Sequence, residues 1–73
     1  MAKLPICSGE AVIKALQKAG WNIDRQKGSH VTLVKTGSYI ILTVPLHKEL
    51  GPGLLRRLIR DAQMTVEEFE NLL

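Results

Sequence analysis

The sequence predicts one α+β domain in which a helix, three antiparallel strands, a second helix and a short third helix follow one another. Three observations predict it. Apolar residues recur at helical spacing over residues 9–19, strand-like segments with tight turns fill residues 21–44, and a second helical stripe begins after Pro52. Because a lone three-stranded meander is not stable in water, the helices must cover one face of the sheet.

The length and composition limit the kind of site that the chain can build. A chain of 73 residues buries only about 60% of the surface that its unfolded form exposes, so a deep substrate cavity hardly fits. We therefore expect a shallow surface site, which suits a polymer better than a small metabolite. The sequence shows no membrane-length apolar run, no signal-peptide pattern and a single cysteine, Cys7, which together predict a cytoplasmic protein.

The first helix is predicted from its two ends and from its apolar stripe. Ser8 is a favourable N-cap residue, and Gly20 is expected to end the helix in the left-handed conformation. Trp21 can then fold back on Leu16, as the Schellman motif favours. The apolar stripe consists of Val12, Ile13, Leu16 and Ala19.

Three strand-like segments follow the first helix. In the first, the alternation predicts that Trp21, Ile23 and Arg25 share one face. The third is rich in β-branched residues and is stopped by Pro45. Turns this short join neighbouring antiparallel strands, so the segments form a meander. The expected strands span residues 21–27, 30–35 and 39–44, with turns at residues 28–29 and 36–38.

The alternation along the second strand indicates which side chains leave the core. Val31 and Leu33 fall on one face of this strand, whereas His30, Thr32 and Val34 fall on the other. If Val31 and Leu33 pack against the helices, His30 points away from them.

The second helix is predicted to begin at Pro52, since proline suits the first helical position. Its apolar stripe consists of Leu54, Leu55, Leu58, Ile59 and Ala62. Arg56, Arg57 and Arg60 are predicted to lie together on its other face. There they could bind a phosphate backbone, bind an acidic partner protein, or form an ordinary solvated surface.

A last short helix is predicted to begin at Thr65. Thr65 and Glu68 have the spacing of a capping box, and Met64 and Phe69 have that of a hydrophobic staple. Residues 61–73 hold four acidic residues and no Lys or Arg, whereas residues 1–60 hold all ten Lys and Arg and three acidic residues. This asymmetry predicts a basic body that meets an anionic partner, although solvated surface charge is an equal alternative.

The strongest candidate site is the tripeptide Gly28-Ser29-His30 at the start of the second strand. Histidine has an unperturbed pKa near neutrality, so it can accept and return a proton. Arg25 and Lys27 supply charge for phosphate contacts, Gly28 lets the backbone approach a phosphate, and Ser29 adds a hydroxyl donor. A histidine beside fixed positive charge suits acid–base cleavage of a phosphodiester. The alternative is an inert histidine that caps a strand end.

The other candidates are weaker. His47 could act as an acid together with His30 or contact RNA, or it could bond to the backbone of its own loop. The two histidines, 17 positions apart, and the distant Cys7 lack the paired spacing of zinc ligands, so neither a metal nor another cofactor is expected. Cys7 precedes a helix N-terminus but has no catalytic companions, and we expect it to be structural. Trp21 and Tyr39 could stack on bases, although Trp21 is better placed for the core.

Four blocks of the sequence resemble the HicA toxin family, and the likeness runs from about Ser8 to Phe69. The Gly-Ser-His block and the Val-Pro-x-His block, at this separation, form a specific pair. The blocks are Lys-Ala-Gly-Trp (Lys18 to Trp21), Arg-Gln-Lys-Gly-Ser-His (Arg25 to His30), Val-Pro-Leu-His (Val44 to His47) and Glu-Leu-Gly-Pro-Gly-Leu-Leu-Arg-Arg-Leu-Ile-Arg (Glu49 to Arg60).

This resemblance implies a double-stranded-RNA-binding-domain-like fold, whose helix–three strands–helix order agrees with the elements above. It also implies an mRNA-cleaving toxin of bacteria or archaea that a HicB antitoxin holds inactive. It assigns the catalytic histidine to His30. The chain departs from the family pattern at Gly53-Leu54-Leu55, at Ala62-Gln63 and at Val31. None of these departures touches His30.

We therefore expect a metal-independent endoribonuclease that acts on single-stranded or locally structured mRNA. His30 would withdraw the ribose 2′-hydroxyl proton, and the products would be a 2′,3′-cyclic phosphate and a 5′-hydroxyl. Arg25 or Lys27 would stabilise charge in the transition state. The acid that protonates the leaving oxygen could be His47, Lys27, or His30 acting again through water.

The expected partners are mRNA and a HicB-like antitoxin, and whether the two proteins form a higher-order assembly is left open. Two other classes of function compete with the enzyme. One is a non-catalytic RNA-binding module with the same fold, because duplex RNA is recognised largely by shape and needs no histidine. The other is a partner-binding subunit with no role in RNA chemistry, which would leave His30 idle.

Overall fold

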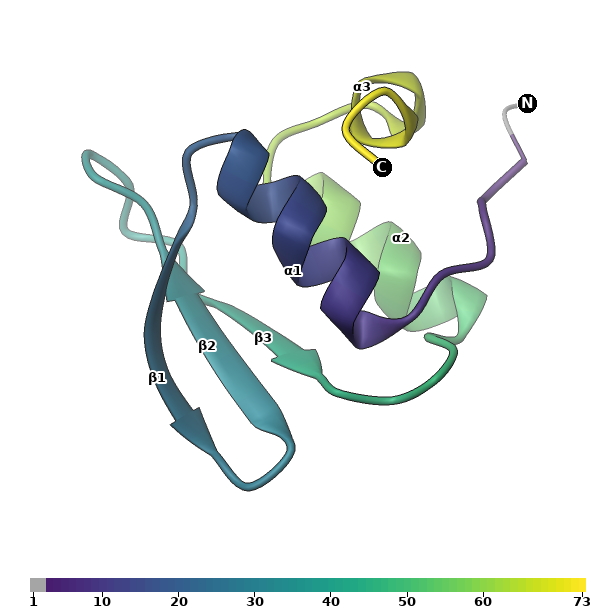
Figure 1. The fold of residues 1–73 in the computed structure, drawn as a ribbon. Helices are drawn as coiled ribbons and strands as arrows, with labels where there is room; N and C mark the ends of the chain where they lie inside the picture. The colour runs from purple at the N-terminus through teal and green to yellow at the C-terminus, as the bar shows by residue number, and fades with distance from the viewer. Residues whose placement is uncertain (1–2) are drawn as a thin grey trace.

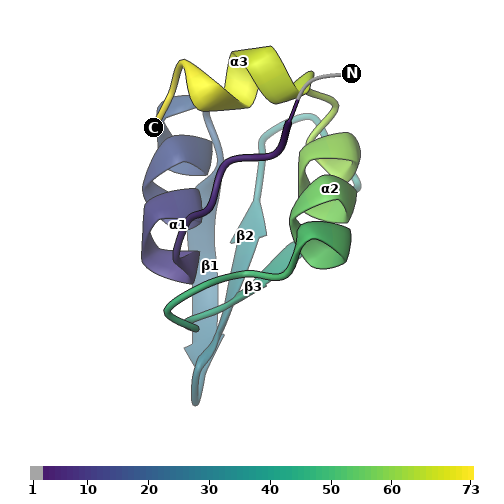
Figure 2. The ribbon, with the colours of Figure 1, turned by 90° about the vertical axis from the view of Figure 1, so that its right-hand side faces the viewer.

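The computed structural model describes residues 3–73 as a three-stranded sheet with helices on one face. The strands pair antiparallel in the order β1-β2-β3. Helices α1 and α2 lie side by side over this sheet, and α3 crosses their ends on the side opposite the β1–β2 turn (Figure 1, Figure 2). The layout confirms the predicted α+β order and is that of a double-stranded-RNA-binding-domain-like fold. The elements are α1 (Gly9–Lys18), β1 (Asn22–Lys27), β2 (His30–Val34), β3 (Leu42–Pro45), α2 (Pro52–Asp61) and α3 (Val66–Glu70).

Helix α1 has the two ends that its sequence predicts. The Ser8 side chain accepts a hydrogen bond from the Ala11 N–H at 3.1 Å. Gly20 has φ +101°, and the Trp21 N–H donates to the Leu16 carbonyl at 3.0 Å. Together with the bond from the Gly20 N–H to the Gln17 carbonyl at 3.0 Å, this bond forms the predicted Schellman motif. The motif buries Trp21 in the core and sends the chain into β1.

The core fills the space between the sheet and the three helices. Val31 and Leu33 are buried, as the alternation along β2 predicts, while His30 on the opposite face is exposed. Burying one large aliphatic or aromatic side chain contributes about 1.5–3 kcal/mol to the free energy of folding. The sheet therefore strongly favours the orientation in which the face that carries Val31 and Leu33 packs against the helices. The largest fully buried side chains of the core are Val12, Leu16, Leu33, Leu42, Val44, Leu55 and Phe69.

Strand β1 departs from simple alternation. Ile23 pairs with Leu33, but Arg25 pairs with Thr32, so Asp24 is an extra residue that forms a β-bulge. Residues directly opposite each other in a sheet share a face. Ile23 therefore lies on the helix-covered face and Arg25 on the open face. The prediction that these two residues share a face is wrong, because the bulge inverts the alternation between them.

Strand β3 is shorter than predicted. It begins at Leu42 rather than at Tyr39, and Pro45 is its last residue instead of the residue that follows it. Ahead of the strand, the Ile40 N–H donates to the Ser38 hydroxyl at 3.1 Å. A local side-chain bond of this kind competes with strand pairing. Tyr39 is fully exposed outside the sheet.

The last two helices begin where the sequence predicts. Pro52 is the first residue of α2, and Gly51 before it is the N-cap residue. The Thr65 hydroxyl accepts from the Glu68 N–H at 3.0 Å, and the Glu68 carboxylate accepts from the Thr65 N–H at 2.8 Å. This reciprocal pair is the predicted capping box. Helix α3, with its acidic residues, lies at the end of the molecule remote from the β1–β2 turn (Figure 1).

Candidate functional site

His30 is the first residue of β2 and directly follows the β1–β2 turn. Gly28 in this turn has φ +59°, a left-handed conformation that glycine adopts without a steric penalty. A Cβ added there would meet nothing within 4 Å, so the turn's conformation, not crowding, favours glycine. The Gln26 side-chain amide donates to the Gly28 carbonyl at 3.0 Å and braces the turn.

The strand register brings two cations to the face that carries His30. Lys27 is directly opposite His30, and Arg25 is directly opposite Thr32. Because opposed residues share a face, all three charged or titratable side chains project from the open side of the sheet, and all are exposed. The bulge at Asp24 keeps Arg25 on this side. Arg25 has its Nε 3.8 Å from the Asp24 carboxylate, an exposed pair that screens its charge only weakly.

The Val-Pro-Leu-His segment, which includes the end of β3, lies beside the Gly-Ser-His turn. His30 pairs with Pro45, and the Leu46 N–H donates to the Ser29 carbonyl at 2.7 Å. His47 is therefore the residue directly after Leu46, whose N–H is bonded to the turn. Within residues 3–73, neither imidazole forms a hydrogen bond to another residue.

Gly9 ties the start of α1 to the same loop, and the sequence analysis did not single it out. Its N–H donates to the His47 carbonyl at 2.9 Å. A Cβ at this position would overlap the Pro45 carbonyl oxygen and lie 2.9 Å from the Pro45 carbonyl carbon. Only glycine fits this approach. The one signal in the sequence is a glycine directly after a helix N-cap, which local capping rules do not require.

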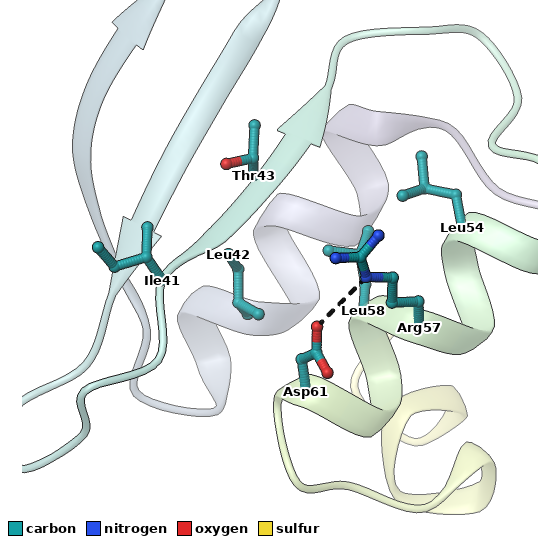
Figure 3. Close-up of a pocket in the computed structure, with 7 residues that line it drawn as sticks. All are labelled: Ile41, Leu42, Thr43, Leu54, Arg57, Leu58 and Asp61. Carbon is teal, nitrogen blue, oxygen red and sulfur yellow. Dashed lines mark ion pairs between the residues drawn. The ribbon is translucent and has the colours of Figure 1, made fainter.

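The three arginines of α2 border two different hollows. All are exposed, but Arg57 borders a groove of about 280 Å³ between α2 and β3 (Figure 3). Arg56 and Arg60 instead border a depression of about 410 Å³ beside α3. Arg57 and Arg60 nevertheless meet at Asp61, whose carboxylate oxygens lie 3.8 Å from the Nε of each. None of the three arginines joins His30, because α2 covers the other face of the sheet (Figure 2).

The weaker candidates take structural places. Cys7 is buried, and this burial raises the pKa of its thiol. Trp21 is buried and carries Lys35 over its ring at 5.9 Å, so its faces do not accept a base. Within residues 3–73, no three His, Cys, Asp or Glu side chains gather as metal ligands. None of the helices within residues 3–73 combines the length and the apolar character that a membrane span needs.

Comparison with known proteins decides the family. A family model described as the HicA toxin of bacterial toxin-antitoxin matches residues 9–64. The chain belongs to the HicA toxin family. As a HicA protein it is a toxin of a toxin–antitoxin system, and its family membership implies an antitoxin partner. The matched range contains both histidines, His30 and His47, and the two cations on the open face of the sheet, Arg25 and Lys27. No curated protein matches this HicA chain closely enough to count as a relative.

Proposed function

We propose that this HicA protein is an endoribonuclease that cleaves mRNA with His30 as its catalytic base. The observation that carries the proposal is the register of β1 against β2, which sets His30, Lys27 and Arg25 on one open face of the sheet. No helix of the described chain lies over this face (Figure 2). An open surface admits a polymer at any point along its length, as an endonuclease requires.

His30 withdraws the proton of a ribose 2′-hydroxyl, and the 2′-oxygen attacks the adjacent phosphorus. The bond from phosphorus to the 5′-oxygen breaks, which leaves a 2′,3′-cyclic phosphate and a 5′-hydroxyl. A positioned general base contributes about 10²–10⁴-fold to such a step. One histidine on an exposed surface therefore makes a slow enzyme, which is sufficient for a toxin that inactivates messages.

Lys27 and Arg25 stabilise the negative charge that builds on the phosphoryl oxygens. Lys27 opposes His30 directly, and Arg25 lies two residues before Lys27 on the same face. Arginine can donate two hydrogen bonds to a phosphate, whereas lysine acts as a compact charge. We assign Lys27 the closer role because its partner in the register is the base itself. Gly28 and Ser29 leave the backbone of the turn and a hydroxyl open to the same phosphate.

The leaving 5′-oxygen needs a proton, and three groups can supply it. His47 follows the loop segment that is bonded to Ser29, and Lys27 stands opposite His30. His30 itself can return its proton through water. A His47→Gln variant separates the first choice from the other two. If His47 is the acid, the variant slows cleavage of an ordinary RNA but not of a substrate with a good leaving group.

The chemistry uses side chains alone, so we propose that cleavage continues in EDTA. The partner that restrains it is a HicB-like antitoxin, and the place of action is the cytoplasm, where messages are translated.

The test is an end-group analysis of the products. An end-labelled mRNA is incubated with the purified protein, beside the same RNA with one 2′-deoxynucleotide at the mapped cleavage site. We expect 2′,3′-cyclic phosphate ends from the first RNA and no cleavage of the second at that site. Cleavage of the deoxy-substituted RNA would overturn the mechanism. Binding without cleavage would favour the non-catalytic RNA-binding module.

A further inference from the structure

Strand β3 leaves an unpaired backbone edge on the sheet. It is the last strand in the order β1-β2-β3, and the Leu46 N–H bond to the Ser29 carbonyl continues its ladder with β2. Pairs in an antiparallel ladder alternate between those that exchange hydrogen bonds and those that do not. The Val31–Val44 and Leu33–Leu42 pairs are thus bonded, and the Thr32–Thr43 pair is not. The N–H and carbonyl of Thr43 therefore point away from β2, toward the free edge.

The two edges of the sheet are not alike. The β1 edge carries a bulge at Asp24 and several charged side chains, which are the devices that prevent a further strand from adding. Strand β3 has neither a bulge nor a charged residue within Leu42–Pro45. Only its short length and Pro45 limit pairing there. The β3 edge is thus the one open to a further strand.

Beside this edge lies the groove of about 280 Å³ between β3 and α2, which we call the β3–α2 groove. Its floor is apolar, formed by the buried Leu42 and Leu58. Ile41, 64% exposed, stands at one end and the partly exposed Leu54 at the other (Figure 3). An extended chain beside Thr43 would cover both of these side chains. A peptide strand matches both the apolar floor and the N–H and carbonyl of Thr43 better than a nucleic acid does, because it offers apolar side chains together with a donor and an acceptor.

The charge of the groove favours an acidic occupant. Asp61 forms ion pairs with two arginines, since Arg57 Nε and Arg60 Nε each lie 3.8 Å from its carboxylate. The Arg57 side chain is 72% exposed and retains donors for a second carboxylate. A second copy of this chain is a poor occupant, because residues 1–60 hold ten basic residues against three acidic ones and the copies would repel.

We propose that an extended, acidic segment of the antitoxin docks in the β3–α2 groove and adds to β3 as a fourth strand. Its backbone pairs with Thr43, one of its apolar side chains covers Ile41, and one of its carboxylates binds Arg57. Strand addition of this kind takes affinity from backbone bonds and specificity from side-chain pockets. The inference rests on the proposed pairing with a HicB-like antitoxin. It does not depend on the role of His30, because the groove lies at the sheet edge under α2.

The test measures binding of a purified HicB-like antitoxin to a His30→Ala toxin, so that catalysis plays no part. Two matched pairs of variants are compared: Ile41→Lys with Ile23→Lys, both replacing an exposed isoleucine, and Arg57→Glu with Arg56→Glu on one helix. We expect Ile41→Lys and Arg57→Glu to raise Kd by about tenfold or more, a loss of about 1.4 kcal/mol, and the controls to stay within about threefold. Melting temperatures establish that each variant folds.

Amide hydrogen exchange supplies the second readout, and we expect the Thr43 amide to exchange more slowly in the complex than in the free toxin. Wild-type Kd values for Ile41→Lys and Arg57→Glu, equal losses in the controls, or an unprotected Thr43 amide would each overturn the proposal. So would protection of Thr43 in the free toxin that rises with concentration, which would identify a second copy as the occupant. Protection by RNA alone would identify a nucleic-acid groove. If the toxin does not cleave RNA, the proposed function fails while these binding results still decide the docking surface.

Discussion

Replacing Gly9 with alanine tests how tightly α1 is fitted against the candidate site. The added Cβ would overlap the Pro45 carbonyl oxygen and lie 2.9 Å from its carbon. These are backbone atoms at the end of β3, so they cannot rotate away as a flexible side chain would. The Gly9 N–H also donates to the His47 carbonyl at 2.9 Å. Any shift that relieves the overlap must therefore stretch this bond.

The magnitude follows from three contributions. Forcing an extra methyl group into a packed site costs about 1–3 kcal/mol, and weakening one hydrogen bond costs about 0.5–1.5 kcal/mol. Alanine in a helix recovers about 0.5–1 kcal/mol relative to glycine. The net loss for Gly9→Ala is about 2 kcal/mol. For a domain of this size, that corresponds to a fall in Tm of roughly 10 °C.

Thermal unfolding followed by circular dichroism measures this loss, and Gly53→Ala is the matched control. Gly53 lies in the first turn of α2, and a Cβ there meets nothing within 4 Å. We expect the control to melt at or slightly above the wild-type temperature. A Gly9→Ala protein that melts with the wild type would refute the close contact between α1 and the end of β3.

Three further predictions concern single side chains. Lys27→Gln should slow RNA cleavage by about tenfold or more, because it removes the charge opposite His30, while Lys14→Gln on α1 should leave the rate unchanged. Thr65→Ala should lower the free energy of unfolding by about 0.5–2 kcal/mol through loss of the capping box, and an unchanged urea midpoint would count against that role. Since burial raises the pKa of the Cys7 thiol, a disulfide reagent should label it much faster in denaturant than in the folded protein. The unfolded state therefore releases this proton more readily, so the stability contributed by Cys7 should be complete below the pKa of the unfolded thiol and decline as the pH rises through the folded value.

The parts of the fold that the sequence predicts are set by local chemistry. Ser8 and Gly20 bound α1 because each satisfies backbone groups within a few residues of itself. The same is true of Thr65 at the start of α3. The outward position of His30 follows from strict alternation along β2, which is a regular strand with two buried residues to fix its face.

The parts that escaped prediction depend on residues far apart in the chain. The bulge at Asp24 is set by how β1 pairs with β2, and no residue type in β1 predicts it. Gly9 is required because Pro45, far along the chain, passes against it. The run Tyr39 to Ile41 has high strand propensity, but pairing stops at Leu42 because the turn before it uses Ser38 to bind the Ile40 amide. The direction of Arg57 toward β3 likewise depends on how α2 packs on the sheet.

The most direct measurement is the single-turnover rate of mRNA cleavage by a His30→Ala protein beside the wild type, with RNA affinity measured on the same samples. If His30 is the catalytic base, the variant should bind RNA with an affinity within about threefold of wild type and cleave it at least about 100-fold more slowly. Cleavage by His30→Ala at the wild-type rate would contradict the role of His30 and move the chemistry to another group.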